Sequence, residues 1–219
     1  MTFRQTRIRK TLEIRARIIQ AIRSFFIASG YLEVETPCRI PVPIPEAHIE
    51  AERSGRWFLQ TSPEICMKQL LAAGYPRIFQ ICRCFRKEER GDRHLPELTM
   101  LEWYTQDADY FDMMAQCENM IRSVSQTVRS SGVLRYQGQT VELSGPWARM
   151  TVTDAFDRYA SESMAQAVQK GCFDEMMALE VEPYLGREKP LFLYEYPAAE
   201  AALAKLTNEN PALAQRFEL

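Results

Sequence analysis

Alternating apolar and polar side chains mark two neighbouring stretches between Arg77 and Tyr104, one on each side of a charged loop. Side chains two positions apart in a strand share a face. In the first stretch the polar face carries Gln80, Cys82, Cys84 and Arg86, and the apolar face carries Phe79, Ile81 and Phe85. In the second the polar face carries Glu102 and Tyr104, and the apolar face carries Leu101 and Trp103. The pattern predicts a long β-hairpin that buries the apolar face and presents Gln80 and Arg86 to an open site.

The residues on the polar face and in the connecting loop indicate a chemistry. Arg86 ends a rigid strand, and the loop that follows carries acidic and basic side chains, including Glu88 and His94. A cation followed by a charged loop suits a polyphosphate and its metal ion. The pair Glu102 and Tyr104 suits an ammonium group.

Helical and strand periods also organise the N-terminal part of the chain. Apolar residues at helical spacing from Thr11 predict an amphipathic helix that Gly30 ends. Residues 1–10 are expected to be a loose leader, residues 31–37 a strand, residues 39–54 an irregular loop and residues 57–60 a short strand.

The segment Thr61-Ser62-Pro63-Glu64 has the composition of a helix start. A hydroxyl caps the helix, proline occupies its first turn, and an acidic side chain lies near the positive end of the helix dipole. This structural role accounts for Ser62 and Pro63. Glu64 either completes the cap or points into the site, and both interpretations stay open.

The second half of the chain predicts mostly helix and strand. Apolar spacing gives a long helix over residues 111–128, and a hairpin follows over residues 133–143. Thr153 is expected to cap a helix. Residues 161–185 are expected to be helical and surface-like, residues 190–197 a buried strand, and residues 198–206 a last helix. No second-domain boundary is visible, so residues 1–219 are expected to form one domain.

Composition narrows the function classes. The net charge of -2 gives no general attraction to nucleic acid. No apolar run approaches the roughly 20 residues of a membrane span, so we expect a cytoplasmic protein without a membrane partner. The cysteines are scattered, and reduced thiols are expected at Cys38, Cys66, Cys82, Cys84, Cys117 and Cys172. Because the pair Cys82 and Cys84 lacks a second cysteine pair, no metal site is predicted.

Several motifs resemble those of a known family. FRKE at residues 85–88, followed by RHLPELTMLEWY, resembles motif 2 of the class II aminoacyl-tRNA synthetases, and FFIASGYLEVETP at residues 25–37 resembles motif 1. TSPEICMKQLLAAG and TMLEWY are similar to segments of the lysine branch. The resemblance implies an α+β fold with an antiparallel sheet flanked by helices, and a homodimer whose interface involves Pro37.

Two features resemble one group within this branch, the elongation factor P lysyltransferases. Few residues precede the first helix, so an N-terminal anticodon-binding domain is not expected, and Gln80 stands where lysyl-tRNA synthetases usually have Glu. The segment EKPLFLYEYPAAEAALAKL is also similar to that group. This resemblance implies ATP and Mg²⁺ as cofactors, activation of lysine or (R)-β-lysine as an adenylate, and transfer to a lysine of translation elongation factor P. No anticodon-domain contact with tRNA is expected.

The resemblance assigns roles by position. Arg86 would be catalytic and would contact the α-phosphate of ATP. The ATP-binding residues would be Arg86, Glu88, His94 and Leu95, and the substrate-binding residues would be Ser62, Pro63, Glu64, Gln80, Glu102 and Tyr104.

The chain also departs from the family pattern, which leaves alternatives. Motif 3 and the strand before it are not found before Leu219, so we expect a chain truncated at its C-terminus and an incomplete sheet. Lys87, Leu95 and Leu98 replace the family's Asn, a polar residue and an adenine-stacking Phe. The alternatives to the lysyltransferase are a core fragment of a lysyl-tRNA synthetase and a catalytically inactive paralogue that binds a partner or ligand.

Overall fold

The computed structural model describes residues 4–46, 49–91, 94–129, 132–136 and 138–219. Contacts within the chain divide it into two compact units, one formed by Ile22–Asp107 and the other by Met1–Ala21 together with Ala108–Leu219. That residues 1–219 act as one catalytic core stays a prediction. The structure has helices and mixed sheets, which confirms the α+β class.

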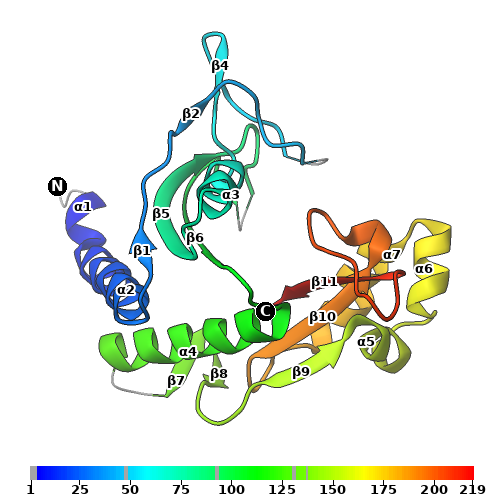
Figure 1. Cartoon of the computed structure of the whole chain (residues 1–219). Helices are drawn as coiled ribbons and strands as arrows, with labels where there is room; N and C mark the ends of the chain where they lie inside the picture. Colours follow the sequence, from blue (N-terminus) through cyan, green and yellow to red (C-terminus); the bar gives the residue numbers. More distant parts are fainter. Residues whose placement is uncertain (1–3, 47–48, 92–93, 130–131, 137) are drawn as a thin grey trace. The chain divides into compact units, whose positions relative to one another are not determined.

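The unit of residues 22–107, which we call the hairpin unit, combines short strands with one long hairpin (Figure 1). Its elements are the end of α2 (Arg9–Ala28), β1 (Leu32–Glu33), β2 (Arg39–Ile40), β3 (Arg53–Ser54), β4 (Trp57–Leu59), α3 (Glu64–Ala72), β5 (Arg77–Phe85) and β6 (Glu97–Thr105).

Strands β5 and β6 form the predicted hairpin. They pair antiparallel along their whole length, with Phe79 opposite Trp103 and Gln80 opposite Glu102, while β1 adds to β5 in parallel. Opposed residues share a face. The structure thus confirms the division into an apolar face and a polar face.

An aromatic cluster holds α2 against the apolar face of this hairpin. The ring of Phe26 on α2 stacks on Phe79, with centroids 4.9 Å apart, and also packs against Tyr31 and Trp103. Helix α2 ends as predicted, because Gly30 adopts φ 78° and lets the Tyr31 N–H reach the Phe26 carbonyl at 3.0 Å. The apolar positions of the sequence therefore fix which side of the sheet the helix covers.

Residues 39–54 are more ordered at their ends than the sequence predicts. β2 and β3 both pair with β4, so the expected irregular loop begins and ends in a small antiparallel sheet. Two-residue strands carry too little periodic pattern to be recognised, which explains why this prediction was wrong there. β4 itself confirms the predicted short strand.

The unit of residues 1–21 and 108–219 combines helices with a mixed sheet (Figure 1). Its elements are α1 (Arg4–Arg7), the start of α2, α4 (Tyr110–Arg129), β7 (Val133–Tyr136), β8 (Gln139–Glu142), β9 (Ala148–Thr151), α5 (Val152–Tyr159), α6 (Met164–Lys170), α7 (Phe173–Met176), a π-turn (Met177–Val181), a 3₁₀-turn (Glu182–Tyr184), β10 (Leu191–Pro197), a 3₁₀-turn (Ala198–Glu200) and β11 (Leu213–Glu218).

β10 is the central strand of this unit. It pairs in parallel with β9 and antiparallel with β11, and its buried Phe192 packs with Trp147 and with Met114 of α4. The predicted long helix, the hairpin β7–β8 and the buried strand β10 are all confirmed.

Four expectations for the chain outside the hairpin unit were wrong. The leader is helical from Arg4, since its residues favour helix and Arg9 pairs with Glu13 one turn later. Thr151, not Thr153, caps α5 by accepting the Asp154 N–H. The predicted last helix is a single 3₁₀-turn, and β11 was not foreseen.

The segment of residues 161–185 is helical as expected, but it is not surface-like. Its buried side chains pack into a core with α5 and β10, and they are Ala167, Phe173, Met176, Met177 and Val181. A short helix contains too few residues for its apolar side chains to show a clear helical period, so the sequence pattern assigned this segment to the surface. Among the described residues, no helix is long and apolar enough to cross a membrane.

Candidate functional site

Glu102 lies at the centre of a hydrogen-bonded cluster on the polar face of the hairpin. The Tyr104 hydroxyl donates to Glu102 Oε2 at 2.9 Å, and the Ser62 hydroxyl donates a short hydrogen bond to Glu102 Oε1. Ser62 Oγ also accepts the Glu64 N–H at 3.0 Å, but Pro63 occupies the N-cap position of α3, so the predicted hydroxyl cap lies one residue before the cap. Strand β6 and the start of α3 together bring three predicted residues into contact.

The pKa values in this cluster follow from burial and charge. Burial raises the pKa of Glu102 above its ordinary value of 4.5, although the hydroxyls of Ser62 and Tyr104 oppose that shift. Burial also raises the pKa of Tyr104, and the neighbouring Glu102 charge raises it further. Tyr104 therefore stays a phenol that donates its proton. The Glu102 carboxylate, partly removed from water, is a strong partner for an ammonium group.

Gln80 lies directly opposite Glu102 in the ladder, but it is buried and does not face an open site. Its residue exposure is 2%, which corrects the expectation from the sequence. In the described part of the chain, neither its Oε1 nor its Nε2 has a hydrogen-bond partner. A buried amide without partners costs free energy. At this exposure the Gln80 amide is closed off from a ligand that enters from solvent.

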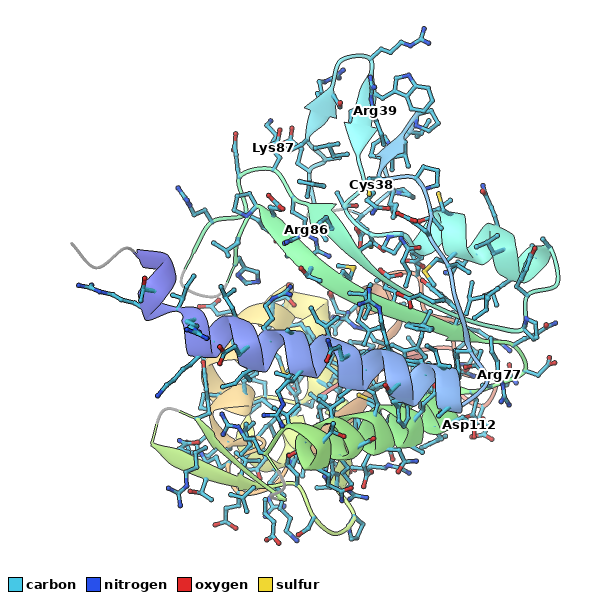
Figure 2. All side chains as sticks on the ribbon, turned by 90° about the vertical axis from the view of Figure 1, so that its left-hand side faces the viewer. Cys38, Arg39, Arg77, Arg86, Lys87 and Asp112 are labelled. Carbon is cyan, nitrogen blue, oxygen red and sulfur yellow. The ribbon has the colours of Figure 1, made fainter. Side chains whose placement is uncertain are left out.

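Arg86 follows β5 directly and retains weakly engaged donors (Figure 2). Its Nε lies 3.5 Å from the Thr61 carbonyl oxygen, and its Nη1 lies 3.7 Å from Glu89 Oε1. Both contacts are at or beyond the limit of a good hydrogen bond. The guanidinium can therefore turn its N–H groups toward an anion such as a phosphate.

The dipeptide Thr61-Ser62 links the two halves of the cluster. Arg86 contacts the Thr61 carbonyl, while Ser62 binds Glu102. The guanidinium and the Glu102 carboxylate thus contact two adjacent residues, and Tyr104 joins them through Glu102. An anion and an ammonium group on one ligand could be bound there together.

Glu64 and Pro63 hold the start of α3. Glu64 Oε1 accepts from Lys68 Nζ at 2.5 Å, one helical turn later, while its charge still contributes to the raised pKa of Glu102. Pro63 is buried immediately before the helix. Of the two interpretations left open for Glu64, the geometry favours the helix start, although its carboxylate stays near the cluster.

The loop between β5 and β6 stands away from these contacts. The Glu88 side chain is 81% exposed and its backbone has φ 60°. His94 and Leu95 are exposed as well, and Asp92 and Arg93 lie outside the described residues. No hydrogen bond or ion pair among the described residues joins Glu88, His94 or Leu95 to Glu102. Their predicted contact with ATP stays a prediction.

A hollow of about 410 Å³ lies beside the residue that follows Arg86. Lys87 lines it. Its backbone N–H donates to the Glu50 carbonyl at 2.8 Å, and its Nζ donates to Glu50 Oε1 at 2.6 Å. These contacts attach the segment before β3 to the end of β5. The lining residues are Pro43, Ile44, Glu46, Ile49, Glu50, Ala51, Glu52, Arg53, Phe58 and Lys87.

Sequence reasoning missed Gln60 and Glu46. Gln60 is fully buried at the end of β4, where its Nε2 donates to the Arg83 carbonyl at 2.9 Å and its Oε1 has no partner in the described structure. Glu46 Oε2 lies 3.5 Å from the Thr61 hydroxyl. Gln60 could have been recognised in the sequence as a polar residue at the end of a short strand, just before the helix start.

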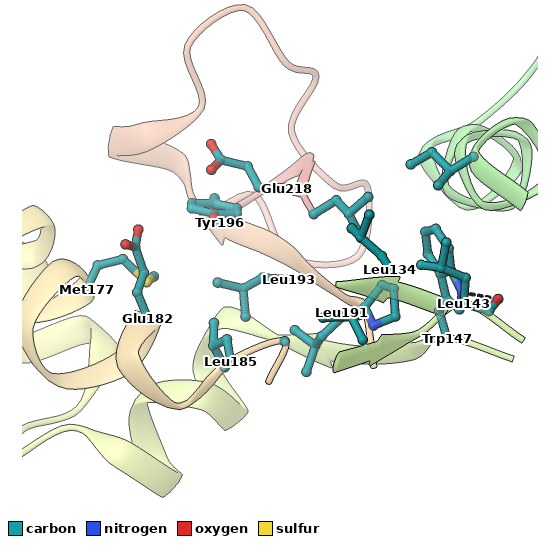
Figure 3. A pocket seen from close by; sticks show the side chains of 15 residues that line it. Leu134, Leu143, Trp147, Met177, Glu182, Leu185, Leu191, Leu193, Tyr196 and Glu218 are labelled. Carbon is teal, nitrogen blue, oxygen red and sulfur yellow. Dashed lines mark hydrogen bonds between the residues drawn. The ribbon is translucent and has the colours of Figure 1, made fainter. Parts of the chain in front are cut away.

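A second hollow, of about 520 Å³, lies in the other unit and is mostly apolar (Figure 3). It lies beside the sheet around β10, with Leu191, Leu193 and Tyr196 on one wall and Trp147 and Leu143 on another. None of the predicted site residues lines it. The candidate chemistry and this apolar hollow are therefore separate features.

Comparisons with known proteins show the family of this chain. The sequence model of the family described as tRNA synthetases class II (D, K and N) matches residues 1–219. An elongation factor P–(R)-β-lysine ligase of Pseudoalteromonas translucida is 36% identical over 95% of this chain and 69% of its own length. One of Mannheimia succiniciproducens is 34% identical with the same coverage, and a lysine–tRNA ligase of Magnetococcus marinus is 32% identical over 98% of this chain and 48% of its own length. The chain belongs to the class II tRNA synthetase family that contains the aspartate, lysine and asparagine enzymes.

Proposed function

We propose that this chain is an ATP-dependent ligase that activates lysine or (R)-β-lysine as an aminoacyl adenylate and transfers it to a lysine of translation elongation factor P. The observation that carries the proposal is the arrangement around Thr61-Ser62, with the Glu102–Tyr104 pair on one side and Arg86 on the other. The relatives' names support the substrate, since two of them are elongation factor P–(R)-β-lysine ligases.

In this proposal Glu102 binds an ammonium group of the amino acid. Tyr104 and Ser62 hold the carboxylate in one orientation through their hydroxyl donors, so it is prepared for the cation before the ligand arrives. These residues orient the substrate and take no covalent part.

Arg86 acts on the phosphate side. The substrate carboxylate attacks the α-phosphorus of ATP, a P–O bond to pyrophosphate breaks, and negative charge grows on the phosphoryl oxygens. The Arg86 guanidinium stabilises that charge with directed N–H donors. The ε-amine of the partner's lysine then attacks the acyl carbonyl, and AMP leaves.

ATP supplies the leaving group, and Arg86 fits its phosphate. The protein offers Mg²⁺ no site of its own among the described residues, because no three His, Cys, Asp or Glu side chains there are placed to hold a metal ion. Mg²⁺ usually binds through substrate phosphates with few protein ligands. In our proposal it accompanies ATP, and Glu88, His94 and Leu95 of the loop approach the nucleotide when it binds.

A lysyl-tRNA synthetase core is the second candidate. Its support is the 32% identity to a lysine–tRNA ligase over 98% of this chain. We place the elongation factor P ligase first because Gln80 replaces the Glu expected of lysyl-tRNA synthetases. A translation-factor substrate would locate the reaction in the cytoplasm.

ATP–pyrophosphate exchange tests the proposal directly. Purified chain is assayed with lysine, with (R)-β-lysine and without amino acid, and the product is then offered to elongation factor P or to lysine tRNA. We expect amino-acid-dependent exchange and transfer to the protein. Transfer to tRNA alone would favour the second candidate. A folded sample that binds lysine but gives no exchange would favour an inactive paralogue and overturn the proposal.

A further inference from the structure

Three sulfur atoms meet on the polar face of the hairpin. Cys82 Sγ lies 3.8 Å from Cys84 Sγ, and Cys84 Sγ lies 3.9 Å from Met100 Sδ. Cys82 and Met100 are direct partners in the β5–β6 ladder, which brings their Cβ atoms within about 5.5 Å. Cys84 Sγ therefore lies within 4 Å of both other sulfur atoms, and we call the three side chains the sulfur triangle.

The spacing of the triangle matches metal coordination. A metal–sulfur bond is about 2.3 Å long, so three sulfurs around one ion lie about 4.0 Å apart in a trigonal site and about 3.8 Å apart in a tetrahedral one. The two measured separations fall at these values. Little movement of the side chains would be needed to place an ion among them.

The ligand chemistry selects the kind of ion. Two thiolates and a thioether are soft donors, which favour Cu(I) over the harder divalent cations. Structural zinc sites use four ligands, usually Cys and His, and no three His, Cys, Asp or Glu side chains among the described residues are placed to hold an ion. Met100 is the third donor, and a thioether suits a monovalent soft cation.

Burial also favours a soft monovalent ion. Cys84 is fully buried at the base of the triangle, whereas Cys82 and Met100 are partly accessible. All six cysteines are free, as the sequence predicted, so both thiols are available. The buried Cys84 is thus flanked by two residues that solvent partly reaches.

We propose that Cys82, Cys84 and Met100 form a binding site for one monovalent soft metal ion, Cu(I) or Ag(I). On binding, two S–H bonds break, two metal–thiolate bonds form, two protons pass to the solvent, and the Met100 thioether donates a lone pair. The metal keeps its oxidation state. The site does not depend on the proposed ligase activity.

Titration of the reduced chain with Cu(I) under anaerobic conditions tests this site. Cu(I) is added in competition with the chelator bicinchoninate, and native mass spectrometry counts the bound ions. We expect one tightly bound ion per chain. Cys82→Ser and Cys84→Ser should each weaken binding at least about 100-fold, since even residues that only support metal ligands contribute roughly 10- to 100-fold.

Met100→Leu is the decisive variant. Leu and Met exchange conservatively in packed positions, so the fold should persist and the thioether alone is removed. We expect a loss of about 10-fold in Cu(I) affinity, and Cys66→Ser and Cys117→Ser serve as matched controls without effect. Wild-type Cu(I) affinity in Met100→Leu, or binding that persists in Cys84→Ser, would show ordinary sulfur packing and overturn the proposal.

Discussion

At the scale of single residues, Glu102 has the most consequential environment in the hairpin unit. Two hydroxyl donors hold its carboxylate while burial disfavours its charge. The hydroxyl donors lower the pKa of Glu102 and burial raises it, and burial has the larger effect. A buried carboxylate whose pKa is shifted in this way is common at functional sites. Two predictions follow from this residue.

Glu102→Gln should abolish most of the amino-acid activation. The substitution keeps the shape and removes the charge, so an ammonium group loses a charge-assisted hydrogen bond of about 1.5–3 kcal/mol. We expect kcat/KM for lysine in pyrophosphate exchange to fall roughly 10- to 100-fold. Glu64→Gln is the matched control, because that carboxylate is held by Lys68, and its effect should be much smaller.

The free energy of unfolding should carry a pH signature of Glu102. Its pKa is higher in the folded protein than the ordinary value of 4.5, so the folded state binds more protons than the unfolded state in this range. Stability from this group is full below 4.5 and is lost as pH rises through the folded pKa. Urea unfolding at several pH values should show this loss in the wild type and not in Glu102→Gln. Parallel curves for the two proteins would contradict it.

At the scale of elements, helix α2 depends on how it ends. Gly30 has φ 78° and permits the turn that brings Tyr31 back to the Phe26 carbonyl. That turn also places Tyr31 against the Phe26 ring, 5.1 Å between centroids. The end of one helix thus sets part of the aromatic packing on the apolar face of β5 and β6.

Gly30→Ala should therefore destabilise the hairpin unit. An added Cβ meets no atom within 4 Å, so the cost is backbone strain in the left-handed region alone, about 1 kcal/mol. Gly91→Ala is the control, since Gly91 lacks a positive φ and its Cβ would also meet open space. Thermal unfolding followed by circular dichroism should show a lower Tm for the first variant and little change for the second.

At the scale of the whole molecule, the unit of residues 22–107 exposes apolar side chains around motif 1. Ile27, Leu32 and Val42 are all exposed large hydrophobic residues, and Pro37 is exposed between them in the sequence. Such side chains gathered along one segment suit a protein–protein contact. They support the homodimer that the motif 1 resemblance implies.

We expect the chain to sediment as a dimer at micromolar concentration. Leu32→Asp should shift it toward monomer, because a charge would be buried without a partner in an apolar interface. Leu179→Asp, at an exposed apolar residue of the other unit, should leave the dimer intact. Analytical ultracentrifugation of the three proteins separates these outcomes, and a monomeric wild type would contradict the prediction.

Much of the fold follows from local patterns. The alternation between Arg77 and Tyr104 predicted the hairpin and its two faces, and the 3.6-residue period predicted α2 and α4. Strands β2, β3 and β11 escaped because short strands owe their existence to partners far away in the sequence. The buried core within residues 161–185 escaped for the same reason.

The sequence by itself determined the residue types of the candidate site, because a strand's period decides which side chains share a face. Arg86, Glu102 and Tyr104 could be named from it, and Ser62 from the resemblance to the family. Only the tertiary structure decided that Gln80 is buried without partners, that Glu64 pairs with Lys68, and that Met100 joins Cys82 and Cys84. Burial and distance depend on how strands and helices pack, and one residue's neighbours in the sequence do not contain that information.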